Sequence, residues 1–267
     1  VRVVACRRGR TPLRAARPTR KGVVARSGPQ DRHVCQRAAR GDDLGKETEA
    51  SQALDAALRQ GRLTILTIGP VTNVATVLKL HPELARNVIR IVAVAGRRPG
   101  QRFAASSNQA RAFRDLNFEL DPAGFQVLLD SGAPIILAPW ELSSKVWMKR
   151  EDLERLNKGG PAAQYLVPPA LDWLDWWHKN LGVDGFNPFD TLAVAYLTSP
   201  KLLQCLELKA QIQTAPDDVT PDAGTKTKPY LYVSNELKSP RTVTYCYNAL
   251  PRFKDDLLYR LLRKTKR

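Results

Sequence analysis

Between residues 50 and 139, short apolar runs alternate with amphipathic segments, and this pattern predicts alternating strands and helices. The run at residues 63–68 is apolar and β-branched and lies between Gly61 and Gly69, as is typical of a strand buried on both faces. Strands of this kind that are joined by helices pair in parallel. We therefore expect an α/β fold with a mostly parallel sheet flanked by helices, built from a helix at 50–59, a strand at 63–68, a helix at 71–80, a strand at 88–95, a helix at 121–129 and a strand at 134–139.

The second half of the chain begins with a helical region rich in tryptophan, at residues 151–181. Trp173, Trp176 and Trp177 follow one another at helical spacing and form a one-sided stripe. Two interpretations stay open: the stripe packs against other helices, or it forms a stacking wall for a base or a sugar. The remaining predicted elements are a helix at 191–197 and strands within 205–247, interrupted by a polar loop at 215–228.

The net charge of +16 is concentrated at the start of the sequence. Twelve arginine and lysine residues against one acid, Asp31, give residues 1–40 a charge of +11, which leaves +5 for the other 227 residues. A basic, weakly periodic segment is more often solvated than folded into a nucleic-acid interface. We therefore predict a basic segment at 1–40 that is atypical or disordered, a domain at 41–267, and no nucleic-acid partner.

The four cysteines, Cys6, Cys35, Cys205 and Cys246, are widely spaced and include no CxxC pair. This spacing predicts free thiols in a reducing compartment, so we expect a cytoplasmic protein. The sequence has no run of about eighteen or more apolar residues, which predicts that no segment spans a membrane. It also begins without an apolar signal segment.

Two segments combine acidic and amide side chains with apolar neighbours: RDLNFELDP at 114–122 and FNPFDTLAVAY at 186–196. Packing alone does not account for this composition, because polar groups beside a core need partners. Oxygen-bearing side chains of this kind can hold sugar hydroxyls or a hard metal ion. In a parallel sheet such sites lie at the carboxyl ends of the strands. The sequence therefore predicts a small-molecule site at that edge.

Several motifs resemble those of the inosine–uridine-preferring nucleoside hydrolase family. The segment LTILTIGPVTNVA at 63–75 is similar to the family's strand–turn–helix that ends in GPLTN. Asn108, followed by the acidic and amide residues of 115–122, is similar to the family's N…EFN…DPEA segment. The other similar segments are 41–45 (the family's G-x-DGLG loop), 81–84 with 88–96 (a helix end and a strand), and 188–196 (the family's H-D-x-L-A-V-A-Y element).

This resemblance implies a Rossmann-like α/β enzyme of purine and pyrimidine salvage that cleaves the N-glycosidic bond of ribonucleosides. It also implies a Ca²⁺ ion that binds ribose hydroxyls and activates the attacking water. By position, Asp190 and the backbone carbonyl of Ile68 are the implied calcium ligands. Asn108, Asp115 and Asn117 are the implied ribose-binding residues. The implied partners are a nucleoside and further copies of the chain, in a homodimer or homotetramer.

The sequence departs from the family at the metal centre. The family begins with a strand that ends in D-x-D-x-x-x-D-D, which supplies two calcium ligands and the catalytic base. Residues 1–40 contain no such cluster, since Asp31 is their only carboxylate, and residues 1–13 resemble a later family segment. Asp115 also lies one residue further from Asn108 than the family spacing gives. The catalytic residues therefore stay unassigned.

A second departure concerns the leaving base. Phe189 stands where many family members place a histidine that protonates the base. Some members use aromatic stacking instead, and here Phe189, Trp140 or the tryptophan stripe could provide it. Asp190 also has a structural alternative, as the N-cap of the helix that follows it.

The resemblance leaves three readings of the chain's activity open. The chain is a hydrolase of this family in truncated form, a degenerate relative that binds a nucleoside-like ligand without cleaving it, or an enzyme with a different metal geometry that recruits Asp42 and Asp43. In the first two readings the metal centre is incomplete in this sequence. Base preference is not visible in the motifs.

Overall fold

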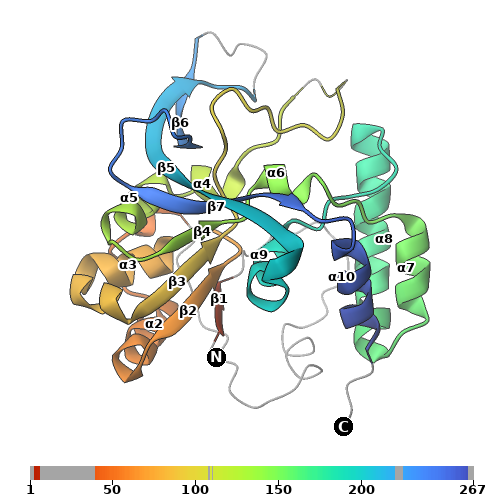
Figure 1. Cartoon of the computed structure of the whole chain (residues 1–267), viewed down its shortest axis with the longest axis horizontal. Helices are drawn as coiled ribbons and strands as arrows, with labels where there is room; N and C mark the ends of the chain where they lie inside the picture. Colours follow the sequence, from red (N-terminus) through yellow and green to blue (C-terminus); the bar gives the residue numbers. More distant parts are fainter. Residues whose placement is uncertain (1–2, 7–39, 108, 110, 220–224, 264–267) are drawn as a thin grey trace. The chain divides into compact units, whose positions relative to one another are not determined.

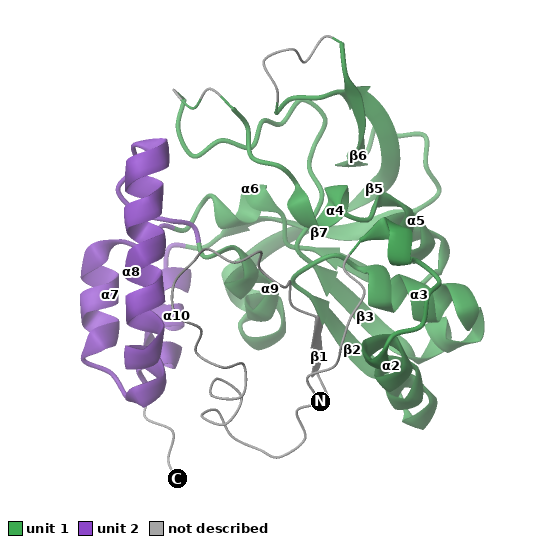
Figure 2. Cartoon of the chain, turned by 180° about the vertical axis from the view of Figure 1, so that it is seen from behind, with its two compact units in different colours: residues 1–8, 35–146, 188–250 green, residues 9–34, 147–187, 251–267 purple. Residues whose placement is uncertain are grey.

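A computed structural model of the chain describes residues 3–6, 40–107, 109, 111–219 and 225–263. The chain divides into two compact units, which Figure 2 colours separately. The larger unit comprises residues 1–8, 35–146 and 188–250, and the smaller unit comprises residues 9–34, 147–187 and 251–267. Because most of residues 1–39 lie outside the described part, the domain boundary expected at residue 40 stays a prediction.

A seven-stranded sheet forms the centre of the larger unit (Figure 1). Its strands are β1 (Val3–Cys6), β2 (Leu63–Thr67), β3 (Val88–Ala93), β4 (Ile135–Leu137), β5 (Leu203–Pro216), β6 (Thr227–Val233) and β7 (Thr242–Ala249). The spatial order is β1-β2-β3-β4-β7-β5-β6. The first five strands in this order pair in parallel, whereas β5 pairs antiparallel with β7 and β6. The expected mostly parallel α/β sheet is therefore confirmed.

Helices α2 (Glu49–Gln60), α3 (Thr72–Leu80) and α5 (Pro122–Asp130) pack their apolar side chains into one core with alternate residues of the sheet. The predicted start of α5 is confirmed, because the Asp121 carboxylate accepts the Gly124 N–H at 2.8 Å. The other helical elements of this unit are η1 (Gly41–Asp43), η2 (Pro82–Asn87), α4 (Leu116–Glu119), α6 (Trp140–Ser143), α9 (Phe189–Thr198) and η3 (Pro200–Leu202).

The sheet curls back on itself at the end of β3. Arg97 follows this strand and forms a bridge with Tyr232 in β6, although β4, β7 and β5 lie between the two strands in the sheet order. The Arg97 N–H donates to the Leu231 carbonyl at 3.0 Å, and the Arg97 carbonyl accepts the Val233 N–H at 2.9 Å. The curl brings the hairpin of β5 and β6 to the carboxyl end of β3.

The smaller unit contains the helices α7 (Arg150–Asn157), α8 (Pro161–Leu181) and α10 (Phe253–Leu262). Trp177 of α8 is fully buried, and its ring packs edge-on against Trp147 and Trp173. Trp176 stacks on Trp173 and is 42% exposed. The packing interpretation of the tryptophan stripe therefore holds for Trp177. None of the helices in the described ranges has the length and apolar character that a membrane crossing needs.

The prediction of free thiols is wrong for two of the four cysteines, because Cys205 and Cys246 form a disulfide. They are 41 residues apart in the sequence, but they lie opposite each other in the antiparallel pair of β5 and β7. Spacing along the chain could not show this, because the pairing depends on the strand register. Cys35 lies outside the described residues, and of Cys6 only the strand backbone is described.

Candidate functional site

The carboxyl ends of β2 and β3 bring three of the predicted site residues to one edge of the sheet. Val94 follows β3, and its N–H donates to the carbonyl of Thr67, the last residue of β2, at 3.2 Å. The side-chain amide of Asn117 donates to the Val94 carbonyl at 2.9 Å. Ile68 follows Thr67 directly, and Asp115 lies two residues before Asn117. Parallel strands position these residues in the way that the sequence pattern predicted.

Asp115 precedes α4 and is only 7% exposed. Its carboxylate Oδ2 accepts the backbone N–H of Gly96 at 2.7 Å. Gly96 has a φ of +90°, and a Cβ added there would lie 2.9 Å from the Leu137 side chain. Glycine is therefore required for the turn that aims this N–H at the carboxylate.

The surroundings of Asp115 raise its pKa to about 6. Burial is the main cause, because it disfavours the charged carboxylate, and the negative charge of Glu119 adds to it. The Gly96 N–H and the positive charge of Arg97 act in the opposite direction. A carboxyl group with this pKa exists in both protonation states near neutral pH, as functional carboxyl groups often do.

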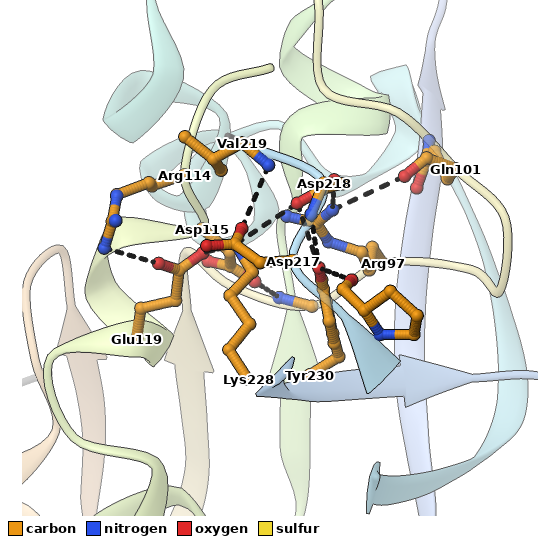
Figure 3. A network of polar contacts seen from close by, with 12 residues as sticks. Arg97, Gln101, Arg114, Asp115, Glu119, Asp217, Asp218, Val219, Lys228 and Tyr230 are labelled. Atoms are coloured by element: carbon orange, nitrogen blue, oxygen red, sulfur yellow. Dashed lines mark hydrogen bonds and ion pairs between the residues drawn. The ribbon is translucent and has the colours of Figure 1, made fainter. Parts of the chain in front are cut away.

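A polar network lies beside α4 and joins it to the hairpin of β5 and β6 (Figure 3). The Lys228 ammonium lies 2.6 Å from Glu119, 3.3 Å from Asp217 and 3.2 Å from Asp218. The Arg97 guanidinium binds Asp218 at 2.6 Å. We call these five residues the Lys228 network. Its two cations hold three carboxylates from two distant parts of the sequence, Glu119 in α4 and the consecutive Asp217 and Asp218.

Hydrogen bonds fix the hairpin end of the Lys228 network. The Tyr230 hydroxyl lies 2.7 Å from the Pro216 carbonyl, and it accepts the Asp218 N–H at 3.0 Å. Burial raises the pKa of Tyr230 to about 12. Burial alone would raise the pKa of Asp218, but the Arg97 charge and the hydrogen bonds from Lys228 and Arg97 together lower it. At neutral pH Asp218 is therefore ionised and Tyr230 is neutral.

An aromatic cluster connects the segment before α4 with the start of α9. The ring of Trp140 is 5.0 Å from that of Phe113, 5.3 Å from that of Phe189 and 6.0 Å from that of Phe103, measured between centroids. Trp140 is buried, whereas Phe189 is half-buried. Of the two rings Trp140 and Phe189, Phe189 therefore keeps the more accessible one. Asp190 comes next in the sequence.

Asp190 lies in the first turn of α9 and is exposed. The helix begins at Phe189 with Pro188 in the N-cap position, so Asp190 already lies inside the helix. The Thr191 hydroxyl donates to the Pro188 carbonyl at 2.5 Å. The alternative role of Asp190 as an N-cap is therefore wrong. Its implied role as a metal ligand stays a prediction.

The described residues do not fit the calcium ion that the resemblance implies. Within them, no group of three or more His, Cys, Asp or Glu side chains could hold a metal ion. Calcium takes six to eight oxygen ligands, whereas Asp190 and the Ile68 carbonyl account for a small part of such a set. Asn108, the remaining predicted site residue, lies outside the described residues.

Sequence reasoning missed the Lys228 network. It placed Asp217, Asp218 and Lys228 in a polar loop, and the structure places Lys228 inside β6. Lys228 and Tyr230 are two residues apart, so they lie on one face of the strand. The sequence signal for the network was a lysine and a tyrosine two residues apart, preceded in the chain by the consecutive Asp217 and Asp218.

The fold and the site define a class of protein: α/β proteins with a mostly parallel sheet and with acidic and amide side chains at its carboxyl edge. A family model described as inosine-uridine preferring nucleoside hydrolase matches residues 4–246, so the chain belongs to this family. The resemblance seen in the motifs is thereby confirmed.

The curated relatives that match the chain include pyrimidine-specific ribonucleoside hydrolases named RihA. The protein from Citrobacter koseri is 30% identical over 154 residues, which are 57% of this chain and 47% of the relative. The protein from Klebsiella pneumoniae is 28% identical over 157 residues, which are 58% of this chain and 48% of the relative. The chain thus spans about half the length of the curated relatives it matches.

Solved structures of nucleoside hydrolases share the fold. The plant nucleoside hydrolase PpNRh1 has a TM-score of 0.66 at 18% identity, and the match covers 80% of this chain and 67% of that one. The purine-preferring ribonucleoside hydrolase from Gardnerella vaginalis has a TM-score of 0.62 at 21% identity, over 81% of this chain and 66% of that one. At these identities the likeness shows the fold alone.

Proposed function

We propose that the protein acts on ribonucleosides and hydrolyses the N-glycosidic bond between base and ribose. The observation that carries this proposal is the placement of Asp115 and Asn117 at the carboxyl ends of β2 and β3. Membership of the nucleoside hydrolase family supports the same reaction.

In this proposal Asp115 binds a ribose hydroxyl, and Asn117 extends the same polar edge. The ionised carboxylate of Asp115 accepts a hydroxyl hydrogen bond, and it stabilises the positive charge that develops on the sugar as the base leaves. The Gly96 N–H holds this carboxylate in place. Its orientation is thus set before substrate binds, so little reorganisation is needed.

Phe189 is the residue that we assign to the base. Its half-buried ring packs against Trp140, so its position is fixed by the aromatic cluster. A planar base stacks on such a ring. Asn108 would add a ribose contact, and Asp190 a metal ligand, if the resemblance carries over. Because the described residues do not fit a calcium site, we assign no step to the metal and no residue to the activation of water.

A second function is binding of a nucleoside-like ligand without cleavage. The specific observation in its favour is that the described residues contain no group of three or more His, Cys, Asp or Glu side chains that could hold a metal ion. The ribose and base contacts proposed above would still operate in such a binder. The two functions therefore share a site and differ in whether bond cleavage follows.

Two assays on the purified chain separate these functions: release of base from inosine and uridine, with and without calcium, and calorimetric binding of the same nucleosides. If the chain is a hydrolase, we expect Asp115→Asn to lower kcat/KM by about 100-fold or more. Asp175→Asn is the matched control, because this exposed carboxylate lies in the smaller unit. Binding without release of base supports the second function. If the chain neither binds these nucleosides nor releases base from them, both proposals are contradicted.

The predicted assembly and location stay proposals as well. A homodimer or homotetramer is testable by light scattering of the purified chain. The cytoplasmic location rests on the expectation of free thiols, and the Cys205–Cys246 disulfide weakens that reasoning, because structural disulfides persist mainly in oxidising compartments.

A further inference from the structure

Arg97 is a buried cation at the end of β3, with a relative exposure of 2%. Arginine is almost never fully buried unless it is paired. Its backbone is fixed on both sides, because its N–H and carbonyl pair with Leu231 and Val233 around β6. A buried, paired arginine next to the proposed ribose-binding edge calls for a role, since neither of the proposed functions uses it.

The Arg97 guanidinium is held by the ring of Phe103 and by three groups that Figure 3 shows, the Tyr230 ring, the Asp218 carboxylate and the Gln101 carbonyl. It lies 3.9 Å from the centre of the Phe103 ring and 5.0 Å from that of the Tyr230 ring. Its Nη1 donates to the Asp218 carboxylate at 2.6 Å. Its Nε and Nη2 make no hydrogen bond within the described part of the chain. The charge of Arg97 is thus fixed in position and is only partly neutralised by hydrogen bonding.

The same stretch of backbone holds Asp115. The Gly96 N–H that binds the Asp115 carboxylate belongs to the residue directly before Arg97. The pairing of Arg97 with β6 therefore also fixes the direction of the Gly96 N–H. Asp218, on the hairpin of β5 and β6, anchors the other end of the arginine.

We propose that Arg97 is a positioning residue for Asp115. It aims the Gly96 N–H at the carboxylate, and its positive charge keeps this buried group able to ionise. Through Asp218, the hairpin of β5 and β6 becomes part of the support for the ribose-binding edge. The inference rests on the proposed function in one respect: Asp115 is the residue taken to touch the substrate.

Of the other titratable groups around Asp115, Glu119 acts against its ionisation and Tyr245 is neutral. Glu119 on α4 raises the pKa of Asp115 through its negative charge, and burial does the same. Tyr245 on β7 also interacts electrostatically with Asp115, and burial raises the pKa of this tyrosine, so it is neutral at physiological pH. Arg97 is therefore the cation that offsets these effects at Asp115.

The test is the titration of Asp115 in the full chain, followed by NMR of the aspartate carboxyl carbons and assigned through the signal that Asp115→Asn removes. In Arg97→Met we expect the pKa of Asp115 to rise from about 6 to above about 7, because a nearby opposite charge is lost. Arg97→Lys keeps the charge and should leave it within about half a unit of the parent value. Arg97→Gln is neutral but can still donate to Asp218, and we expect the same rise in the pKa of Asp115. It replaces the methionine variant if that variant does not fold.

A merely structural role for Arg97 gives a different result. Loosened packing would admit water around Asp115 and would lower its pKa toward the ordinary value near 3.8. A fall or no change in Arg97→Met and Arg97→Gln therefore overturns the proposal. If the pKa rises as expected but the parent chain neither binds nor cleaves nucleosides, the proposed function fails while the positioning role of Arg97 stands. If the parent is active, the acidic limb of its kcat/KM profile should move upward with the pKa of Asp115.

Discussion

The two aspartates that the sequence assigned to the site lie in contrasting surroundings. Asp115 is buried, accepts a backbone N–H, and lies beside cations and carboxylates drawn from β3, α4 and the hairpin of β5 and β6. Asp190 is exposed in the first turn of α9, one residue after the start of the helix. The Asp115 region is thus preorganised, whereas the Asp190 region has only part of the ligand set that its implied role requires.

This difference indicates that the two aspartates contribute unequally to ligand binding. A preorganised carboxyl group can bind and orient a sugar without help from a metal ion. A calcium ligand acts only together with several other oxygens, so one exposed carboxylate contributes little. The Asp115 region therefore supports the proposed nucleoside binding more strongly than the Asp190 region does.

The largest effect is expected from Lys228→Met. This substitution leaves Glu119, Asp217 and Asp218 without their shared cation in a largely buried position. We expect the free energy of unfolding to fall by about 3–5 kcal/mol at pH 7, measured by urea unfolding. The control is Lys46→Met, which removes an exposed pair with Asp43 and should cost less than about 0.5 kcal/mol. Equal losses in the two variants would contradict the network's importance.

The second prediction is that Asp115→Asn raises the free energy of unfolding, by an amount that depends on pH. The pKa of Asp115 is raised to about 6 in the folded protein, above its ordinary value of 3.8, so the native state binds the proton more tightly and stability falls as pH rises through this window. An asparagine side chain cannot titrate, so Asp115→Asn should gain about 2–3 kcal/mol relative to the parent between about pH 4 and pH 8. Urea unfolding across that range measures the gain. A gain that is the same at every pH would contradict the raised pKa.

A third prediction concerns the turn that holds Asp115. Gly96→Ala places a Cβ 2.9 Å from Leu137 at a φ of +90°, so we expect a loss of about 1–2 kcal/mol. Gly61→Ala is the matched control, because nothing lies within 4 Å of its added Cβ and its φ of 163° is extended backbone. Thermal unfolding of both variants checks the prediction. Alanine tolerated equally at both positions would show that the turn does not need glycine.

The sequence predicted the parallel part of the sheet well because each buried strand is a continuous apolar run, as in β2 and β3. It also predicted a small-molecule site at the carboxyl edge of the sheet, since parallel strands share one carboxyl end, and Asp115 and Asn117 lie at that edge. It could not predict the disulfide or the Lys228 network. Both depend on the register and curl that bring β5 and β6 against distant strands, and no local pattern records which strands become neighbours.

The smallest effect is expected on the Asp190 side. Calcium at about 1 mM should raise the free energy of unfolding by less than about 0.5 kcal/mol, because an exposed carboxylate and one backbone carbonyl bind the ion weakly. Asp190→Asn should leave this small response unchanged in thermal scans with calcium or with a chelator. If calcium raised the free energy of unfolding by more than about 1 kcal/mol and Asp190→Asn abolished this gain, the Asp190 region would not be the weaker of the two. Asp190 would then be a metal ligand whose partners lie outside the described residues, and the two regions would form one calcium-dependent site.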